Sequence, residues 1–121
     1  LKSIDSYDVI YLGHPNYLGT MPMAVFTFFE QFAELNDDVL FGEVWSREDK
    51  LSSRDRSIVT VTTLMASGIL DSSLKFHLAN AKKHSVTQEE IAEIITHAAF
   101  YAGWPKAWAA FNMAKEVWKE N

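Results

Sequence analysis

The sequence predicts an all-α fold, a bundle of about five helices with a short strand or arm at the N-terminus. Apolar residues recur at helical spacing from about residue 36 to the end of the chain, and helix-starting and helix-ending residues separate these runs. The β-prone run, Val9–Leu12, is confined to the N-terminal part. A length of 121 residues with 48% hydrophobic composition suits a single compact core rather than a disordered chain.

The N-terminal part combines an expected strand with an expected helix. Gly13 and Pro15 end the run Val9–Leu12, which predicts a short buried strand. Pro22 is placed for the first turn of a helix that carries several apolar residues. These are Ala24, Val25, Phe28, Phe29 and Phe32.

Two further helices are expected in the middle of the chain. Asn36 or Asp37 is placed to cap a short helix that ends near Trp45. Ser53 is placed to cap a longer helix that stops at Gly68. The β-branched residues of this longer segment favour a strand as the alternative, but its length favours a helix.

The last three helices have the clearest boundaries. Asp71 is expected to cap a helix whose apolar face carries Leu74, His77, Leu78 and Ala81. Thr87 and Glu90 match a capping box, with Val86 and Ile91 at the positions of a hydrophobic staple. That helix is expected to reach Ala102, and Pro105 is expected to open the final one.

Composition excludes several classes of function. The formal net charge of −5 and the lack of a basic stripe disfavour nucleic acid as a partner. The absence of cysteine excludes disulfides, zinc–thiolate sites and thiol redox chemistry. No apolar stretch is long enough for a bilayer, and no signal peptide is evident, so a cytoplasmic protein without membrane contact is expected.

Four stretches carry a resemblance that spans residues 32–118. They are "VLFGEVWSRE", "LSSRDRSIVTVTTLMASG", "LKFHLANAKKHSVTQEEIAEIITH" and "AFYAGWPKAWAAF". Together they resemble the carboxymuconolactone decarboxylase-like family of the alkylhydroperoxidase D-like superfamily. The resemblance implies an all-α domain over residues 32–121, assembly as homo-trimers or hexamers, sites near subunit boundaries and, in the decarboxylase branch, a lyase.

Residues 6–32 resemble a different kind of domain. The stretch "YDVIYLGHPNYLGTMPMAVFTFFEQF" is similar to the middle of a flavodoxin-like domain, but the phosphate-binding loop of flavodoxins is missing. A single strand cannot form the parallel sheet that presents a flavin. We therefore expect residues 1–31 to be a flavodoxin-like remnant or N-terminal arm that serves association, and we expect no bound cofactor.

The lack of cysteine separates the branches of this superfamily. In the redox branch a Cys-x-x-Cys pair precedes a histidine by seven and four residues, and counting back from His77 gives Leu70 and Ser73. The upstream acid of that branch would fall near Ser57. Since a thiolate is the nucleophile in peroxide reduction, thiol peroxidase activity is not expected. An imidazole remains suited to acid–base chemistry, because its ordinary pKa lies near about 6.5.

Candidate catalytic residues follow from these patterns. His77 is either a hydrogen-bonded core residue or the acid–base group of a pocket that takes a lactone or another small acidic metabolite. His97 and Tyr101 stand four residues apart and so share one helix face. They are interpreted either as a proton donor and an oxyanion donor or as residues that pack at an interface. The alternative function is a non-catalytic ligand-binding or oligomerisation module associated with a flavodoxin.

Candidate substrate-binding residues are less distinctive. Arg54 and Arg56 suit a substrate carboxylate, but positions two apart point to different sides, and an ion pair with Glu43 or Glu48 is the alternative. Glu43 among aromatic residues is a potential acid or a salt-bridge partner, and Trp104 is a potential pocket wall or packing residue. The four histidines show no metal-ligand spacing, so no metal is expected.

Overall fold

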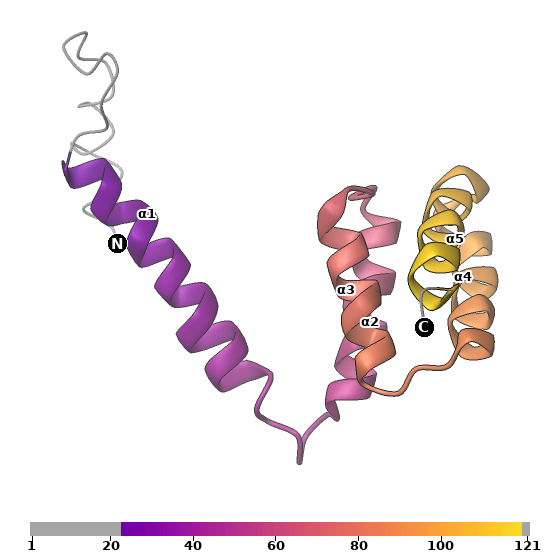
Figure 1. Cartoon of the computed structure of the whole chain (residues 1–121), viewed down its shortest axis with the longest axis horizontal. Helices are drawn as coiled ribbons and strands as arrows, with labels where there is room; N and C mark the ends of the chain where they lie inside the picture. Colours follow the sequence, from indigo (N-terminus) through magenta and orange to yellow (C-terminus); the bar gives the residue numbers. More distant parts are fainter. Residues whose placement is uncertain (1–22, 120–121) are drawn as a thin grey trace, which may run out of the picture. The chain divides into compact units, whose positions relative to one another are not determined.

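The computed structural model describes the backbone of residues 23–119 and the side chains of residues 27–119. The chain divides into two compact units, Leu1–Ser46 and Arg47–Asn121. All regular structure in the described residues is helical, which confirms the predicted all-α class (Figure 1). The predicted strand Val9–Leu12 and most of the flavodoxin-like stretch lie outside the described residues. The predicted domain boundary at residue 31 stays a prediction.

In the first unit, helix α1 (Met23–Leu35) continues into a π-helix, η4 (Asn36–Val44). Leu35 has helical angles, φ −64° and ψ −39°, and no side chain caps the second segment. The predicted cap at Asn36 or Asp37 is therefore wrong, because the chain passes from one helix into the other without an extended residue. The i→i+5 pattern appears in the bond that the Trp45 amide donates to the Leu40 carbonyl, at 2.9 Å.

The second unit is a four-helix bundle made of α2 (Ser53–Ala66), α3 (Ser72–Lys83), α4 (Gln88–Ala102) and α5 (Trp104–Lys119) (Figure 1). Helix α2 contacts the other three, and α5 also contacts α3 and α4. The core of the bundle consists of aliphatic side chains that are almost fully buried, among them Val61, Met65, Leu74, Leu78, Ile91 and Ile95. Alanines on α4 and α5 (Ala98, Ala99, Ala107, Ala110 and Ala114) are buried too.

The helix starts in this unit follow local hydrogen bonds. The Thr87 hydroxyl accepts from the Glu90 amide at 3.0 Å, and the Glu90 carboxylate accepts from the Thr87 amide at 2.9 Å, so the predicted capping box is confirmed. Asp71 accepts from the Ser73 amide at 2.9 Å, as predicted. The predicted cap at Ser53 is one residue late, because Ser52 accepts from the Asp55 amide.

Two helices of the bundle end in left-handed turns. After α2, Gly68 has φ +81°, and the Ile69 amide donates to the Leu64 carbonyl at 2.9 Å. After α3, Ser85 takes the same role with φ +78°, and the Val86 amide donates to the Ala81 carbonyl at 3.0 Å. Both are Schellman turns, but only the first has the glycine that such a turn favours.

Candidate functional site

His77 lies on α3 between two core leucines. Leu74 and Leu78 are fully buried, whereas the His77 side chain is partly exposed, and its ring meets the edge of the Phe76 ring with centroids 4.9 Å apart. The buried His77 Nδ1 has no hydrogen-bond partner among the described residues. Burial also lowers the pKa of His77 below its ordinary value, because desolvation penalises the imidazolium. The ring is therefore neutral at pH 7, with one buried nitrogen unsatisfied.

His97 and Tyr101 share one face of α4, as their spacing predicts. Their ring centroids are 5.2 Å apart, and both side chains are exposed, Tyr101 by 83%. Within residues 27–119, no hydrogen bond or ring contact links either of them to His77. The pair thus forms an exposed aromatic surface on α4.

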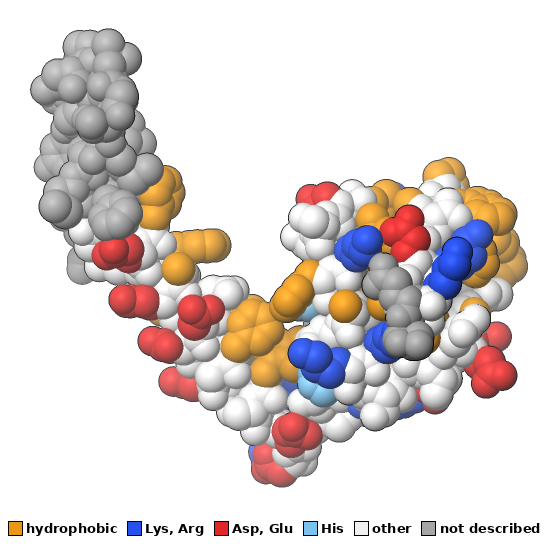
Figure 2. Space-filling view, in the orientation of Figure 1, with side chains coloured by type: hydrophobic (Ala, Val, Ile, Leu, Met, Phe, Trp, Pro, Cys, Tyr) orange, Lys and Arg blue, Asp and Glu red, His pale blue; other side chains and the backbone are white. Residues whose placement is uncertain are grey.

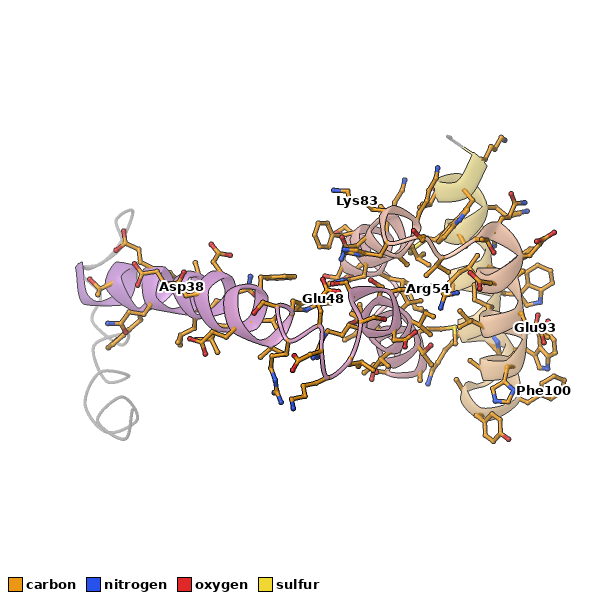
Figure 3. All side chains as sticks on the ribbon, turned by 90° about the horizontal axis from the view of Figure 1, so that it is seen from below. Asp38, Glu48, Arg54, Lys83, Glu93 and Phe100 are labelled. Atoms are coloured by element: carbon orange, nitrogen blue, oxygen red, sulfur yellow. The ribbon has the colours of Figure 1, made fainter. Side chains whose placement is uncertain are left out.

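Arg54 joins α2 to α4 through an ion pair with Glu90. The guanidinium also lies 3.5 Å from the Asp55 carboxylate (Figure 3 labels Arg54 on α2). Hydrogen bonds donated to the Glu90 carboxylate lower its pKa. The largest effect comes from the Thr87 amide, and Arg54 adds to it. The sequence left an ion pair with Glu43 or Glu48 as the alternative to substrate binding by this arginine; the ion-pair partner is Glu90, 36 residues away along the chain.

The remaining predicted binding residues occupy different places. Arg56 donates from Nε to the Leu51 carbonyl at 3.2 Å and from Nη2 to the Arg47 carbonyl at 3.1 Å, so it braces the loop before α2. Glu43 is exposed on η4 in the first unit. Trp104 is 51% exposed at the start of α5.

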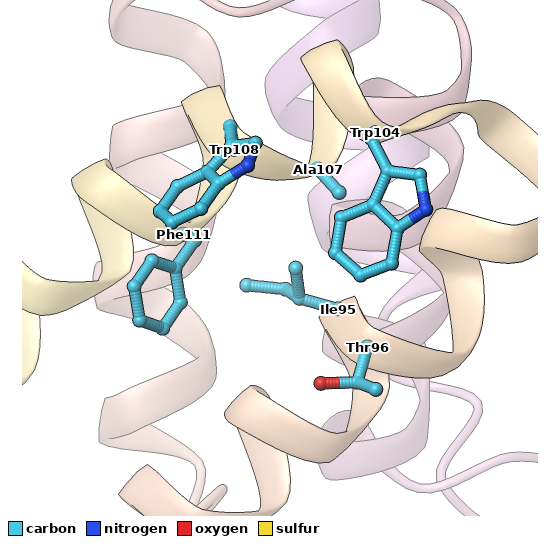
Figure 4. A pocket seen from close by; sticks show the side chains of 6 residues that line it. All are labelled: Ile95, Thr96, Trp104, Ala107, Trp108 and Phe111. Carbon is cyan, nitrogen blue, oxygen red and sulfur yellow. The ribbon is translucent and has the colours of Figure 1, made fainter.

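Trp104 lines a shallow hollow of about 150 Å³ between α4 and α5. In Figure 4 the rings of Trp104 and Trp108 stand on either side of Ile95, with Phe111 beside Trp108. A second hollow of about 160 Å³ shares Ile95 and Phe111 with the first. We call the two together the α4–α5 groove; its lining residues are Gln88, Ile91, Ala92, Ile95, Thr96, Trp104, Ala107, Trp108, Phe111, Ala114, Lys115 and Trp118.

The sequence pointed to Trp104 as a pocket wall but missed the rest of this groove. Trp108, a second ring of this groove, is 56% exposed. The signal was present in the spacing of Trp104, Trp108 and Phe111, which places three rings along one side of α5. His77 is not among the lining residues.

A second histidine contact was not foreseen. Ser57 is fully buried on α2, its hydroxyl donates to the Ser53 carbonyl at 2.9 Å, and the same oxygen lies 3.3 Å from His84 Nδ1. Ser57 stands near the position at which the redox branch of the superfamily would have an acid. In this chain that position holds the buried Ser57 hydroxyl, whose proton is donated to a backbone carbonyl. This arrangement suits a structural role and not a proton relay.

The described residues offer neither a metal site nor a membrane-spanning helix. No group of histidine, aspartate and glutamate side chains in the described part of the chain is arranged to hold a metal ion. None of the helices between residues 23 and 119 is both long and apolar enough to cross a lipid bilayer.

Two comparisons with known proteins show the family of the chain. The sequence model of the carboxymuconolactone decarboxylase family matches residues 30–116. A 4-carboxymuconolactone decarboxylase of Acinetobacter baylyi is 40% identical over 93 residues, which are 77% of this chain and 68% of that protein. No solved structure matches at a significant level. Nothing found supports the flavodoxin-like resemblance of residues 6–32. With its all-α fold and a match over most of its length, the chain belongs to the carboxymuconolactone decarboxylase family.

Proposed function

We propose that this protein is a cofactor-free lyase that decarboxylates a lactone acid or a similar small acidic metabolite, with His77 as its acid–base group. The observation that carries the proposal is the buried, unpartnered Nδ1 of His77. A buried polar nitrogen without a partner costs about 1–3 kcal/mol, so a position that keeps one suits a ligand that completes the hydrogen bond. The relative that shares 40% identity is a 4-carboxymuconolactone decarboxylase, which supports the same class of substrate.

The chemistry asks for a proton donor with a modest pKa. Loss of carbon dioxide breaks a carbon–carbon bond and leaves its electron pair on the substrate as an enolate, which one proton then quenches. Desolvation lowers the pKa of His77, so the imidazolium, once it forms, releases its proton readily. In this proposal His77 takes a proton from water and passes it to the substrate carbon.

His97 and Tyr101 are proposed as accessory donors that stabilise the enolate oxygen. Both are exposed on α4, so they would act at a site completed by another subunit. Arg54 and Arg56 are already engaged by Glu90 and by backbone carbonyls, which favours their structural interpretation over binding of a substrate carboxylate.

The test is turnover of 4-carboxymuconolactone and related lactone acids by the wild type and two histidine variants. His77→Gln removes the titratable group and is expected to lower kcat/KM by about 10²–10⁴-fold, the usual contribution of a general acid–base group. His84→Gln is the matched control, because it makes the same change at the end of the same helix and is expected to retain activity. Equal activity of His77→Gln and the wild type, or no turnover of any of these acids by the wild type, would contradict the proposal.

A second candidate function, self-association, is favoured by a separate observation. Phe100, Tyr101, Trp104 and Trp108 are exposed by 72%, 83%, 51% and 56%. Figure 3 shows Phe100 pointing away from the bundle. Exposed aromatic side chains gathered on one face are typical of surfaces that another protein covers. We propose that the protein forms homo-oligomers through this face, which sedimentation analysis of the whole chain would test.

A further inference from the structure

We propose that the α1 segment of a second copy of this chain occupies the α4–α5 groove, so that copies exchange their N-terminal helices. This inference rests on the self-association proposed above and adds the segment and the surface that meet. It does not depend on the lyase activity.

The groove is an apolar surface with a single charge. Apart from Gln88, Thr96 and Lys115, its lining side chains are aliphatic or aromatic, and Lys115 is the charged one among them. The Lys115 ammonium lies 5.3 Å from the centre of the Phe111 ring, and Phe111 lines both hollows. Figure 2 shows hydrophobic side chains gathered at the side of the bundle where α4 and α5 lie. The groove therefore suits an apolar helix with acidic neighbours.

Helix α1 has the complementary surface. Phe29, Phe32 and Leu35 are exposed by 58%, 75% and 57%, and their spacing places them on one stripe of the helix. In proteins most of the stability of a helix comes from packing of such a stripe against another surface. In Figure 2 hydrophobic side chains follow one side of this helix and acidic ones the other.

Charge supports the same pairing. Residues 23–46 contain five acidic side chains and no basic one; the five are Glu30, Glu34, Asp37, Asp38 and Glu43. Residues 47–119 contain ten basic and eight acidic side chains. Opposite net charges on the two segments favour encounter between the first of one copy and the second of another. Mutual exchange fills every groove of a closed oligomer, as the symmetry of such assemblies requires.

The test uses one variant on each side of the proposed contact. Phe32→Glu alters the helix, Trp108→Glu alters the groove, and Val59→Glu on α2 is the control, because it places the same charge at an apolar position that is also exposed, by 54%. Sedimentation equilibrium of the whole chain measures association, and circular dichroism checks that each variant stays helical. Phe32→Glu and Trp108→Glu are each expected to weaken association at least about tenfold, as loss of an aromatic anchor does, and Val59→Glu is not.

Mixing the two variants tests the exchange itself. A Trp108→Glu chain keeps an intact α1, and a Phe32→Glu chain keeps an intact groove, so the mixture is expected to regain mixed oligomers that neither variant forms alone. Association that Phe32→Glu leaves unchanged, or a mixture that stays monomeric, would overturn the exchange while leaving self-association in place. A wild type that is monomeric at all concentrations would overturn both, and activity of that monomer would leave the lyase proposal standing.

Discussion

Replacing His77 by leucine is expected to make the protein more stable while removing its proposed function. The position lies between Leu74 and Leu78, both fully buried, so an aliphatic side chain fits the surroundings. The change removes the buried Nδ1, which has no hydrogen-bond partner among the described residues. A site that retains a destabilising group is retaining it for something other than folding.

The magnitude follows from two opposing contributions. Removing an unsatisfied buried nitrogen returns about 1–3 kcal/mol of unfolding free energy. Losing the edge contact with the Phe76 ring, whose centroid is 4.9 Å away, costs about 0.5–1.5 kcal/mol. The expected net gain is about 1 kcal/mol.

The gain is expected to grow at acidic pH. Desolvation lowers the pKa of His77 in the folded protein, so below its ordinary value of 6.5 the unfolded chain binds more protons than the folded one. The unfolding free energy of the wild type therefore falls as pH drops below about 6.5, and it continues to fall until the folded state is protonated as well. His77→Leu lacks this contribution, so its stability depends less on pH in that window.

Urea unfolding at pH 7.5 and pH 5.5, followed by circular dichroism, measures both effects. His97→Leu is the matched control, because it makes the same substitution at an exposed position of α4, where it also removes a ring contact, with Tyr101 at 5.2 Å. A destabilisation by His77→Leu relative to this control, with an unchanged pH dependence, would show that the His77 imidazole is hydrogen-bonded in the folded protein and that the expected gain in stability is wrong.

Two further predictions concern helix ends. Ser85 holds φ +78°, so Ser85→Gly is expected to raise the unfolding free energy by about 0.5 kcal/mol, the relief of left-handed strain less the extra chain entropy of glycine. Ser67→Gly at the right-handed cap of α2, with φ −81°, should give no gain in urea unfolding, and a gain equal to that of Ser85→Gly would contradict the reasoning. Hydrogen bonds from Thr87 and Arg54 lower the pKa of Glu90, so the stability that they contribute is lost as pH falls below about 4.5. Glu90→Gln lacks this contribution, and its unfolding free energy is expected to fall less steeply with decreasing pH. Acid unfolding curves measure this, and matching curves for the two proteins would refute it.

Local signals in the sequence were sufficient for the starts of α3 and α4. The capping box of Thr87 and Glu90 and the cap at Asp71 depend on side chains within three residues, so they could be predicted without knowledge of the fold. The cap of α2 was assigned one residue late because two serines stand together. Ser52 accepts from the Asp55 amide, whereas the Ser53 hydroxyl donates to Glu48.

Features that depend on packing between helices could not be predicted in the same way. The partner of Arg54 is 36 residues away, and that of Ser57 is 27 residues away, so neither follows from local spacing. Helical periodicity placed His77 on the core side of α3, but only the assembled bundle shows that its Nδ1 lacks a partner. The α4–α5 groove likewise arises from the packing of two helices. The apolar spacing within each helix does not by itself predict a groove between them.

The role of His77 can be tested on its imidazole ring by nuclear magnetic resonance. In the whole protein labelled with nitrogen-15 on histidine, imidazole resonances assigned with the His77→Gln variant would be titrated with and without 4-carboxymuconolactone. The His77 ring is expected to be neutral at pH 7, to titrate below 6.5 and to shift on adding the lactone acid. A ring that titrates at or above 6.5 and does not respond to the acid would contradict this expectation.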